Sequence, residues 1–168
     1  FKKSSVTWPR PKKRKRKIEC IIVCKDYSDY LAISLPENKK YFDNIFVVSS
    51  YDDDEVKKIC MENDAIFIPY SHFNKDGAKF NKGGAINEGI RHLIYKDWVV
   101  FMDSDIIIKE DFRDMLNNID NFYGSFRRFI PSFCDYENLK NGNKNKNEFE
   151  AIEGSGCGFW QVVNLQGK

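Results

Sequence analysis

Short apolar runs alternate with amphipathic segments along most of the chain. Four almost continuously apolar runs, rich in β-branched residues, predict buried strands. They span residues 18–24, 44–50, 66–70 and 98–103. Between them, apolar residues at helical spacing predict a short helix that stops near Pro36, and longer helices over residues 55–65 and 85–95. This alternation predicts an α/β fold with a mostly parallel, doubly wound sheet covered on both faces.

The two longer helices each carry apolar residues that we expect to face the sheet. These are Val56, Ile59, Cys60, Ile86, Ile90, Leu93 and Ile94. The rest of the chain has weaker patterns, for which we expect a helix over residues 110–119 and strand-like structure over 121–133. A polar loop over residues 137–150 and a glycine-rich turn into a last strand within 154–165 complete the expected order.

Polar residues directly follow three of the predicted strands. They are residues 25–26, 49–54 and 103–105. The carboxyl ends of parallel strands meet at one edge of a sheet, and open α/β sheets bind their ligands outside that edge. The sequence therefore predicts one binding site to which all three segments contribute.

Asp103 and Asp105 end the fourth predicted strand, in the stretch DWVVFMDSDIII. Two carboxylates held this close repel each other, and a hard divalent cation such as Mg²⁺ or Mn²⁺ relieves the repulsion because it prefers oxygen ligands. The alternative is an ordinary strand-to-helix junction in which one aspartate caps the helix that follows. These residues alone do not distinguish a metal site from a helix cap.

The stretch FNKGGAINEGI lies just before that strand. Its paired glycines permit close backbone approach, the start of a helix attracts anions, and Lys82 offers a charge suited to phosphate. The glycines could equally serve only to make a turn. Taken with the two aspartates, the stretch indicates a diphosphate bridged by a metal.

These segments, in this order and spacing, resemble a family 2-type glycosyltransferase with the GT-A fold, the Rossmann-like fold of nucleotide-diphospho-sugar transferases. The resemblance covers residues 18–112, and more loosely the glycine-rich GSGCGFWQ. It implies a glycosyltransferase that binds a nucleotide-sugar donor, UDP-linked or similar, through Mn²⁺ or Mg²⁺ at the DxD motif. The acceptor would be a glycan or another hydroxyl compound, and the resemblance leans towards inversion.

The resemblance also implies roles for individual residues. The expected donor-binding residues are Cys24, Lys25, Asp26, Ser50, Asp52, Lys82, Asn87, Asp103 and Ser104. The expected metal ligands are Asp103 and Asp105, and the expected acceptor side includes Gly156 and Trp160.

The chain departs from the family pattern at two points. Ser49 and Ser50 stand where many relatives carry an acidic pair after the second strand. No residue matches the family's general base, because Glu153 precedes the glycines and belongs to no motif. The catalytic base is therefore left unassigned, and we expect the domain to be incomplete on its C-terminal, acceptor side.

The charge distribution separates residues 1–17 from the rest. Nine of the 27 basic residues lie there without an acid, which leaves 18 basic against 25 acidic residues and a net charge of −7 elsewhere. We expect a flexible basic arm followed by one domain over residues 18–168. As an alternative function, the arm would make the protein a non-catalytic nucleotide- or polyanion-binding module, with nucleic acid one possible partner.

Two further enzyme classes fit the sequence less well. A phosphatase of the haloacid-dehalogenase type carries its DxD on the first strand, whereas here Ile106 to Ile108 follow a motif on the fourth. A nucleotidyltransferase would need a glycine-rich loop directly after the first strand, and residues 24–30 contain no glycine.

Composition favours one globular domain, with 42% hydrophobic residues in 168. Five cysteines without a CxxC pair, and without a nearby histidine pair at zinc spacing, favour neither a disulfide framework nor a zinc site. We expect a reducing compartment, the cytoplasm, with nuclear import through PKKRKRK as an alternative. No run approaches the roughly 20 apolar residues of a membrane span, so none is expected.

Overall fold

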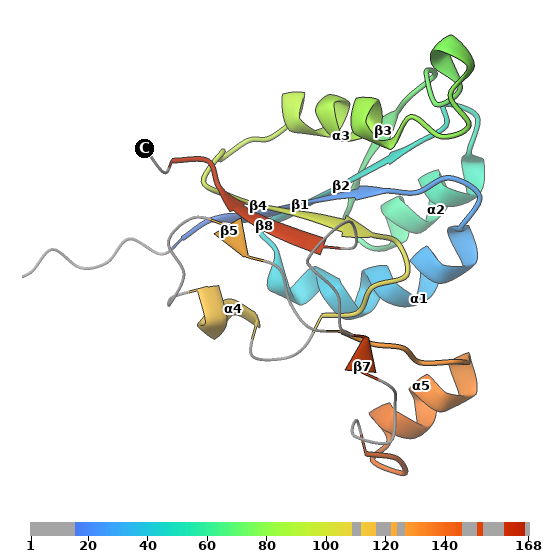
Figure 1. The fold of residues 1–168 in the computed structure, drawn as a ribbon, viewed down its shortest axis with the longest axis vertical. Coiled ribbons are helices and arrows are strands. Elements are labelled where there is room, and N and C mark those ends of the chain that lie inside the picture. Colours follow the sequence, from blue (N-terminus) through green and yellow to red (C-terminus); the bar gives the residue numbers. More distant parts are fainter. Residues whose placement is uncertain are drawn as a thin grey trace, which may run out of the picture.

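The computed structural model describes residues 16–108, 112–116, 122–123, 127–145, 151–152 and 160–166. Within these ranges six strands form one sheet in the order β3-β2-β1-β4-β8-β5 (Figure 1). The strands are β1 (Ile18–Val23), β2 (Asn44–Ser49), β3 (Ile66–Pro69), β4 (Trp98–Asp103), β5 (Phe122–Tyr123) and β8 (Trp160–Asn164). The first four are mutually parallel, and β8 runs antiparallel to both β4 and β5.

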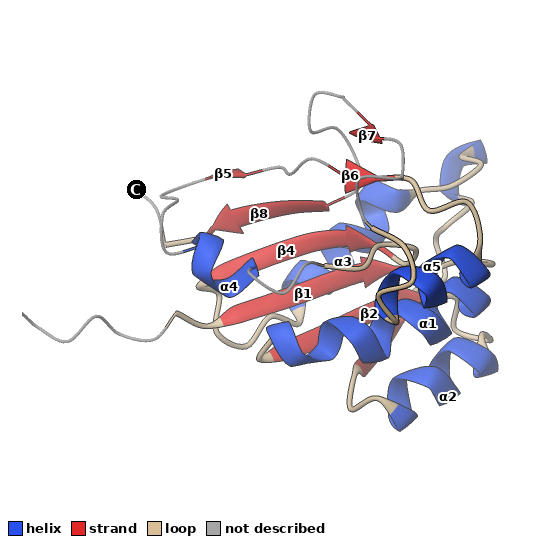
Figure 2. Cartoon of the chain, turned by 90° about the horizontal axis from the view of Figure 1, so that it is seen from below, coloured by secondary structure: helices blue, strands red, loops and turns tan. Residues whose placement is uncertain are grey.

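The parallel strands end at a common edge. Val23 of β1 is paired with Val48 of β2 on one side and with Asp103 of β4 on the other. In Figure 2 the arrowheads of β1 and β4 point towards the same edge, and that of β8 points the other way. This arrangement confirms the prediction of a mostly parallel sheet and brings the three predicted polar segments to one side of the molecule.

Helices cover both faces of the sheet (Figure 1). They are α1 (Ser28–Asn38) and α2 (Asp54–Glu62) on one face, and α3 (Lys82–Arg91) on the other. Alternate residues of β1 serve the two faces, since Cys20 and Ile22 belong to the core cluster beneath α1 and α2, whereas Ile21 and Val23 belong to the cluster beneath α3. Doubly wound packing therefore explains why β1, β2 and β4 are mostly apolar and largely buried. The edge strand β3 was predicted to be buried as well, but it exposes Ile66 and Pro69, because no strand among the described residues pairs with its outer side.

Helix α1 continues past the predicted stop at Pro36 and ends at Asn38, followed by a 3-10 turn (Lys39–Tyr41). Pro36 lacks the N–H that would bond the Ala32 carbonyl, and its ring crowds that carbonyl, so the continued helix bears a local cost. The last turn is held by Asn38, which is fully buried: its Nδ2 donates to the Ile106 carbonyl at 2.7 Å, and Ile108 N–H donates to its Oδ1 at 2.8 Å. Tertiary hydrogen bonds thus outweigh the local signal.

Helix α3 also differs from its prediction at both ends. It begins at Lys82, three residues early, so the paired glycines lie in its first turn, and it stops at Arg91. Because the helix ends there, Ile94 is not held against the sheet, and its side chain is 61% exposed, contrary to the prediction. Val56, Ile59 and Cys60 of α2 are buried as predicted.

The later part of the chain contains short elements. They are α4 (Phe112–Met115), β6 (Arg127–Arg128), α5 (Phe133–Lys140) and β7 (Ala151–Ile152), with β6 and β7 paired as a second, two-stranded sheet. The prediction of a loop from residue 137 is wrong up to Lys140. Helix α5 has a serine cap, since Ser132 Oγ accepts a hydrogen bond from Asp135 N–H at 3.1 Å, and Lys140 forms an ion pair with Glu37 of α1 at 2.5 Å.

Within the described ranges, no helix is long and apolar enough to cross a membrane. Arg16 and Lys17, the last residues of the predicted basic arm, contact the domain: the Arg16 guanidinium lies 4.9 Å from the centroid of the Trp98 ring, and Lys17 N–H donates to Asp97 at 3.0 Å. The prediction of a flexible arm otherwise concerns residues 1–15, which lie outside the described residues.

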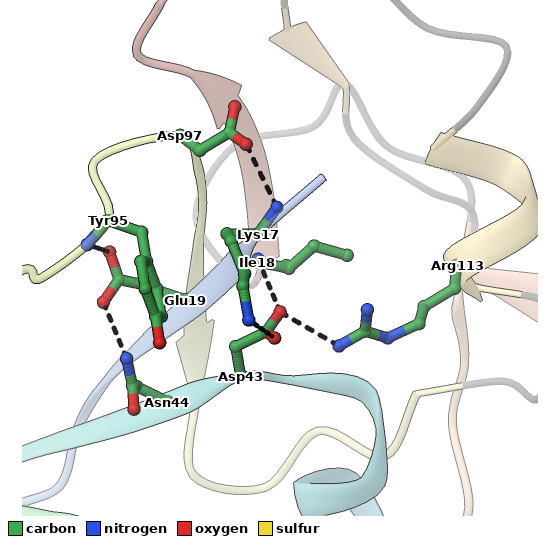
Figure 3. A network of polar contacts seen from close by, with 8 residues as sticks. All are labelled: Lys17, Ile18, Glu19, Asp43, Asn44, Tyr95, Asp97 and Arg113. Carbon is green, nitrogen blue, oxygen red and sulfur yellow. Dashed lines mark hydrogen bonds and ion pairs between the residues drawn. The ribbon is translucent and has the colours of Figure 1, made fainter. Parts of the chain in front are cut away.

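Glu19 is a fully buried carboxylate at the opposite edge of the sheet from the polar segments (Figure 3). Its oxygens accept hydrogen bonds from the backbone N–H groups of the loop that joins α3 to β4, at 2.8–3.0 Å, and from the side chain of Asn44 at 3.1 Å. The donors in that loop are Ile94, Tyr95 and Lys96. The buried charge therefore ties the loop to β1 and β2.

Asp43 lies at the same edge and receives three donors. Lys17 Nζ lies 2.8 Å away, Ile18 N–H 3.0 Å and the Arg113 guanidinium 3.3 Å (Figure 3). Burial by itself would raise the pKa of Asp43, but the hydrogen bonds from Lys17 and Ile18 and the charge of Arg113 outweigh it, so the pKa is lowered. This network closes the start of β1 against the start of β2 and against α4.

Replacing Glu19 with glutamine should destabilise the fold. Glu19→Gln turns one acceptor oxygen into a donor that faces backbone N–H groups, and we expect the free energy of unfolding in urea to fall by about 1–3 kcal/mol. The control is Glu62→Gln on α2, where the side chain is 60% exposed, with an expected change within about 0.5 kcal/mol. Equal effects of the two substitutions would contradict the anchoring role of Glu19.

Asp43→Asn should lower stability in a pH-dependent way. Because the folded-state pKa of Asp43 lies below its unfolded value, its contribution is complete above roughly pH 5 and is lost as the pH falls through the folded-state pKa, below about 4. We expect Asp43→Asn to be less stable by about 1 kcal/mol at neutral pH, with the difference shrinking in acid. Unfolding midpoints measured between neutral pH and acid test this, and a difference that does not depend on pH would contradict it.

Candidate functional site

Lys82 and Asp103 meet at the carboxyl edge of the sheet. Lys82 is the first residue of α3, Asp103 is the last residue of β4, and Lys82 Nζ forms an ion pair with Asp103 Oδ1. The two side chains are 33% and 24% exposed, so the pair is partly shielded from water yet open to a ligand. Two residues predicted to bind one donor from separate segments are therefore in direct contact.

Close packing of α3 on the sheet sets the place of Lys82. Asn81 caps the helix by accepting a hydrogen bond from Gly84 N–H at 2.9 Å. A Cβ on Gly84 would lie 2.2 Å from the Tyr70 hydroxyl, and one on Gly89 would lie 2.7 Å from Cγ2 of Ile21 in β1. Gly89 therefore allows a close approach of the helix to the sheet, and Gly84 a close approach to Tyr70. The paired glycines lie inside the first turn of α3 rather than in a turn before it.

Hydrogen bonds from α1 fix the segment that follows Asp103. Ser34 Oγ donates to the Ser104 carbonyl, and Asn38 binds both Ile106 and Ile108. Ser104 is buried, whereas Asp105 is exposed. Asp105, two residues along the chain from Asp103, is therefore exposed at the end of an anchored turn.

A cavity of about 210 Å³ lies next to the ion pair. Apolar side chains of β1, β4 and α3 form much of its wall, with Lys82 and Asp103 among the polar residues. The lining residues are Ile21, Val23, Lys82, Gly83, Ile86, Phe101, Met102, Asp103 and Gln161. A ligand at the ion pair would therefore find a concave, partly apolar surface under the start of α3.

Cys24 follows β1 and is buried. Burial raises the pKa of its thiol to about 11, although a hydrogen bond with the Ser104 side chain works against this. The thiol is therefore protonated at neutral pH and does not face the edge. Cys24 and Ser104 could contact a ligand only through their backbones, and their predicted donor-binding roles stay predictions.

Lys25 reaches the loop between β3 and α3. Its ammonium lies 3.0 Å from Asn74 Oδ1 and 5.4 Å from the centroid of the Phe73 ring. The Phe80 ring stacks on Phe73 with centroids 5.7 Å apart, and Phe80 is 46% exposed. This flat aromatic surface beside a cation was missed from the sequence, although the aromatic residues interleaved with lysines in the loop were a signal.

The end of β2 has a structural role as well. Buried Ser49 donates to Asp53 Oδ2 at 2.7 Å, and Asp53 Oδ1 caps α2 by accepting from Val56 N–H at 3.0 Å. Of the predicted donor-binding residues in this segment, Ser50 is therefore partly exposed and Asp52 lies exposed in the turn, and Tyr51 between them is 71% exposed.

The other predicted site residues are less constrained. Asp26, in a left-handed conformation with φ 61°, and Asn87 on α3 are both exposed. Trp160 begins β8, where its backbone pairs with Met102. Gly156 and Glu153 lie outside the described residues.

In the part of the chain that the structure describes, no group of three or more histidine, cysteine, aspartate or glutamate side chains could hold a metal. Asp103 and Asp105 nevertheless fit a hard divalent cation, because Mg²⁺ commonly binds through one or two carboxylates and takes its other ligands from substrate phosphates and water. A cation at this place would therefore take its remaining ligands from water or from a phosphate-bearing ligand.

Residues 19–155 match the profile of Glycosyl transferase family 2. The match covers most of the 168 residues, and the chain belongs to this family. The resemblance stated from the sequence is thereby confirmed. A search among functionally curated proteins finds no match.

Solved structures share the fold at low sequence identity. 4-diphosphocytidyl-2C-methyl-D-erythritol synthase from Anaerococcus prevotii gives a TM-score of 0.54 at 15% identity, over 91% of this chain and 73% of that one. Mannosyl-3-phosphoglycerate synthase from Rubrobacter xylanophilus gives 0.56 at 15% identity, over 90% and 54%. Glucosyl-3-phosphoglycerate synthase from Mycobacterium tuberculosis, in complex with Mn²⁺, UDP and glucosyl-3-phosphoglycerate, gives 0.58 at 16%, over 95% and 64%.

These likenesses establish the Rossmann-like GT-A fold that the sequence predicted. The chain spans between 54% and 73% of the lengths of the three proteins. The ligands of the mycobacterial enzyme were observed in that enzyme. At sequence identities this low, the likeness shows only that the fold is shared.

The close approach of α3 can be tested with two alanine substitutions in the same helix. Gly89→Ala should lower the free energy of unfolding by about 1–3 kcal/mol, because the new Cβ would overlap Ile21. Gly83→Ala, where a Cβ would meet nothing within 4 Å, should be neutral or stabilising by up to about 1 kcal/mol. The free energies of unfolding of both variants, measured in denaturant, test this prediction. A Gly89→Ala protein as stable as Gly83→Ala would contradict the close packing.

Proposed function

We propose that this chain is the donor-binding part of a glycosyltransferase that binds a nucleotide-diphosphate sugar at the carboxyl edge of its sheet and transfers the sugar to a hydroxyl acceptor. The observation that carries the proposal is the meeting of Lys82 with Asp103 at the start of α3, beside exposed Asp105. Family membership supports it, because it supplies the reaction class, glycosyl transfer.

The diphosphate would lie at the amino end of α3. The helix dipole and the ammonium of Lys82 both favour an anion there, and Asn87 lies exposed in the next turn. The mycobacterial neighbour that was solved with UDP and Mn²⁺ supports a UDP-type donor by analogy of fold. The sugar would extend from the diphosphate into the cavity beside Asp103.

The nucleobase would lie further along the same edge. Residues 24–26 and the turn with Ser50 and Asp52 would contact it, as the family resemblance implies. Phe80 adds an exposed ring on which a base could stack, close to the ammonium of Lys25. Ser50 would offer a hydroxyl where many relatives carry a carboxylate, so we expect its contact with the base to be weaker.

Asp103 and Asp105 would hold Mn²⁺ or Mg²⁺ together with the donor phosphates. Such a cation, when bound, supplies positive charge against the nucleoside diphosphate that departs. Lys82 would add a second positive charge at the same phosphates, and the walls of the cavity would limit access of water to the sugar. Gly156 and Trp160 are proposed for the acceptor side, and the group that deprotonates the acceptor is not assigned.

The division of the chain is part of the proposal. Residues 1–17 would form a basic arm and residues 18–168 the GT-A domain. Cytoplasmic location rests on the cysteine usage, and inversion of configuration rests on the family resemblance. Polyanion binding by the arm stays the alternative function, carried by the nine basic residues alone.

Calorimetric titration with UDP and UDP-sugars, with and without Mn²⁺, tests the proposal. We expect UDP to bind more tightly when Mn²⁺ is present, and Asp105→Ala to weaken the binding in Mn²⁺ by about tenfold or more, since a metal ligand is lost. The control is Asp114→Ala on α4, an exposed aspartate next to Arg113, which binds Asp43 at the opposite edge of the sheet. Binding that is absent, or that ignores both Mn²⁺ and the Asp105 substitution, would overturn the proposal.

A further inference from the structure

We propose that Lys82 is an internal counter-ion that occupies Asp103 until a diphosphate arrives, and that its transfer from carboxylate to phosphate couples donor binding to metal binding. The inference rests on the proposed function and concerns the same site. In this role Lys82 does more than contact the phosphate. In the absence of nucleotide, its ammonium occupies the carboxylate of Asp103 and so competes with a metal ion for that ligand.

The two partners of the ion pair differ in their freedom to move. Asp103 ends a strand whose neighbouring residues are fixed, since its backbone pairs with Val23 and the flanking residues Met102 and Ser104 are both buried. Lys82 reaches it from the first turn of α3 with a flexible four-carbon chain. If the pair opens, the lysine is therefore the side chain that moves.

Electrostatics oppose simultaneous occupation of Asp103 by lysine and by a metal. The amino end of α3 already carries the positive end of the helix dipole, and Lys82 adds a full positive charge, which Asp103 offsets. A divalent cation at Asp103 would place a further two charges beside the ammonium. A cation alone must therefore either compete with Lys82 or bind through Asp105.

A diphosphate changes this balance because it offers Lys82 a second anion. When Lys82 binds the phosphate, the carboxylate of Asp103 is available to the metal. Nucleotide and metal therefore both favour the state in which the Lys82–Asp103 ion pair is broken. Thermodynamic linkage then requires that nucleotide tighten metal binding and that metal tighten nucleotide binding by one and the same factor. The exposed Asp105 carboxylate has no hydrogen-bond or ion-pair partner among the described residues, so it stays open to the metal in both states.

Lys82→Gln separates this role from a phosphate contact. In the 168-residue chain, we expect Mn²⁺ without nucleotide to bind Lys82→Gln about three- to tenfold more tightly than wild type, because a competing cation has left Asp103. UDP without metal should bind more weakly. The ratio of Mn²⁺ dissociation constants without and with UDP should fall by about threefold or more. Electron paramagnetic resonance of free Mn²⁺ and calorimetry with UDP supply these constants.

Three further variants show whether the specific pair is responsible. Lys82→Arg keeps the charge and a donor for Asp103, so Mn²⁺ alone should bind it as weakly as wild type. Lys79→Gln removes an exposed charge three residues earlier in the chain, and should leave Mn²⁺ binding unchanged. In an Asp103→Asn background, Lys82→Gln should no longer tighten Mn²⁺ binding.

The outcomes separate this inference from the proposed function. If wild type binds UDP and Mn²⁺, and Asp105→Ala weakens that binding, while Lys82→Gln leaves Mn²⁺ affinity without nucleotide unchanged or lower, the exchange is wrong and Lys82 is only a phosphate contact. Equal tightening by Lys79→Gln would likewise overturn it, since any nearby charge would then suffice. If wild type binds neither ligand, the proposed function and this inference fall together.

Discussion

The parallel pairing of β1 with β2 and β4 is the constraint on which the rest of the structure depends. β1 is buried along its whole length, and its register sets Val23 beside both Val48 and Asp103. Every polar residue that follows these strands is therefore delivered to one edge. A slip of one residue in the β4 register would turn Asp103 to the opposite face of the sheet, away from Lys82, and the site would not form.

Helix α3 turns that edge into a site because it lies so close to the sheet. This close packing requires residues without a Cβ at two positions of the helix. They are Gly84, which lies against Tyr70, and Gly89, which lies against Ile21. Glycine is a poor helix former, so these positions exchange some local stability for proximity. The asparagine cap before the helix offsets part of that loss and orients the first turn, which carries Lys82.

The two edges of the sheet treat their charges differently. At the amino edge, Glu19 is buried and saturated by backbone donors, and Asp43 is held by a backbone N–H and two cations. At the carboxyl edge, Asp103 forms an ion pair with Lys82 and remains partly exposed, and Asp105 is exposed. The charges of the amino edge are buried or fully hydrogen-bonded and hold structure together, whereas those of the carboxyl edge remain accessible, which is why the donor site is proposed there.

The sequence by itself determined the four parallel strands, the fold class and the family. Those features follow from the local alternation of apolar and polar residues, and from short motifs whose order can be read along the sequence. It also placed Lys82, Asp103 and Asp105 among the candidates. It did not predict that α1 passes Pro36 or that α3 starts at Lys82, because Asn38 and the glycines act through partners distant in the chain. Nor did the stretch IECIIVC show that Glu19 is a saturated structural anchor. Only the tertiary structure decided that Lys82 and Asp103, 21 residues apart, form one ion pair, because a contact between a helix and a strand depends on the packing distance between them, which no local pattern encodes.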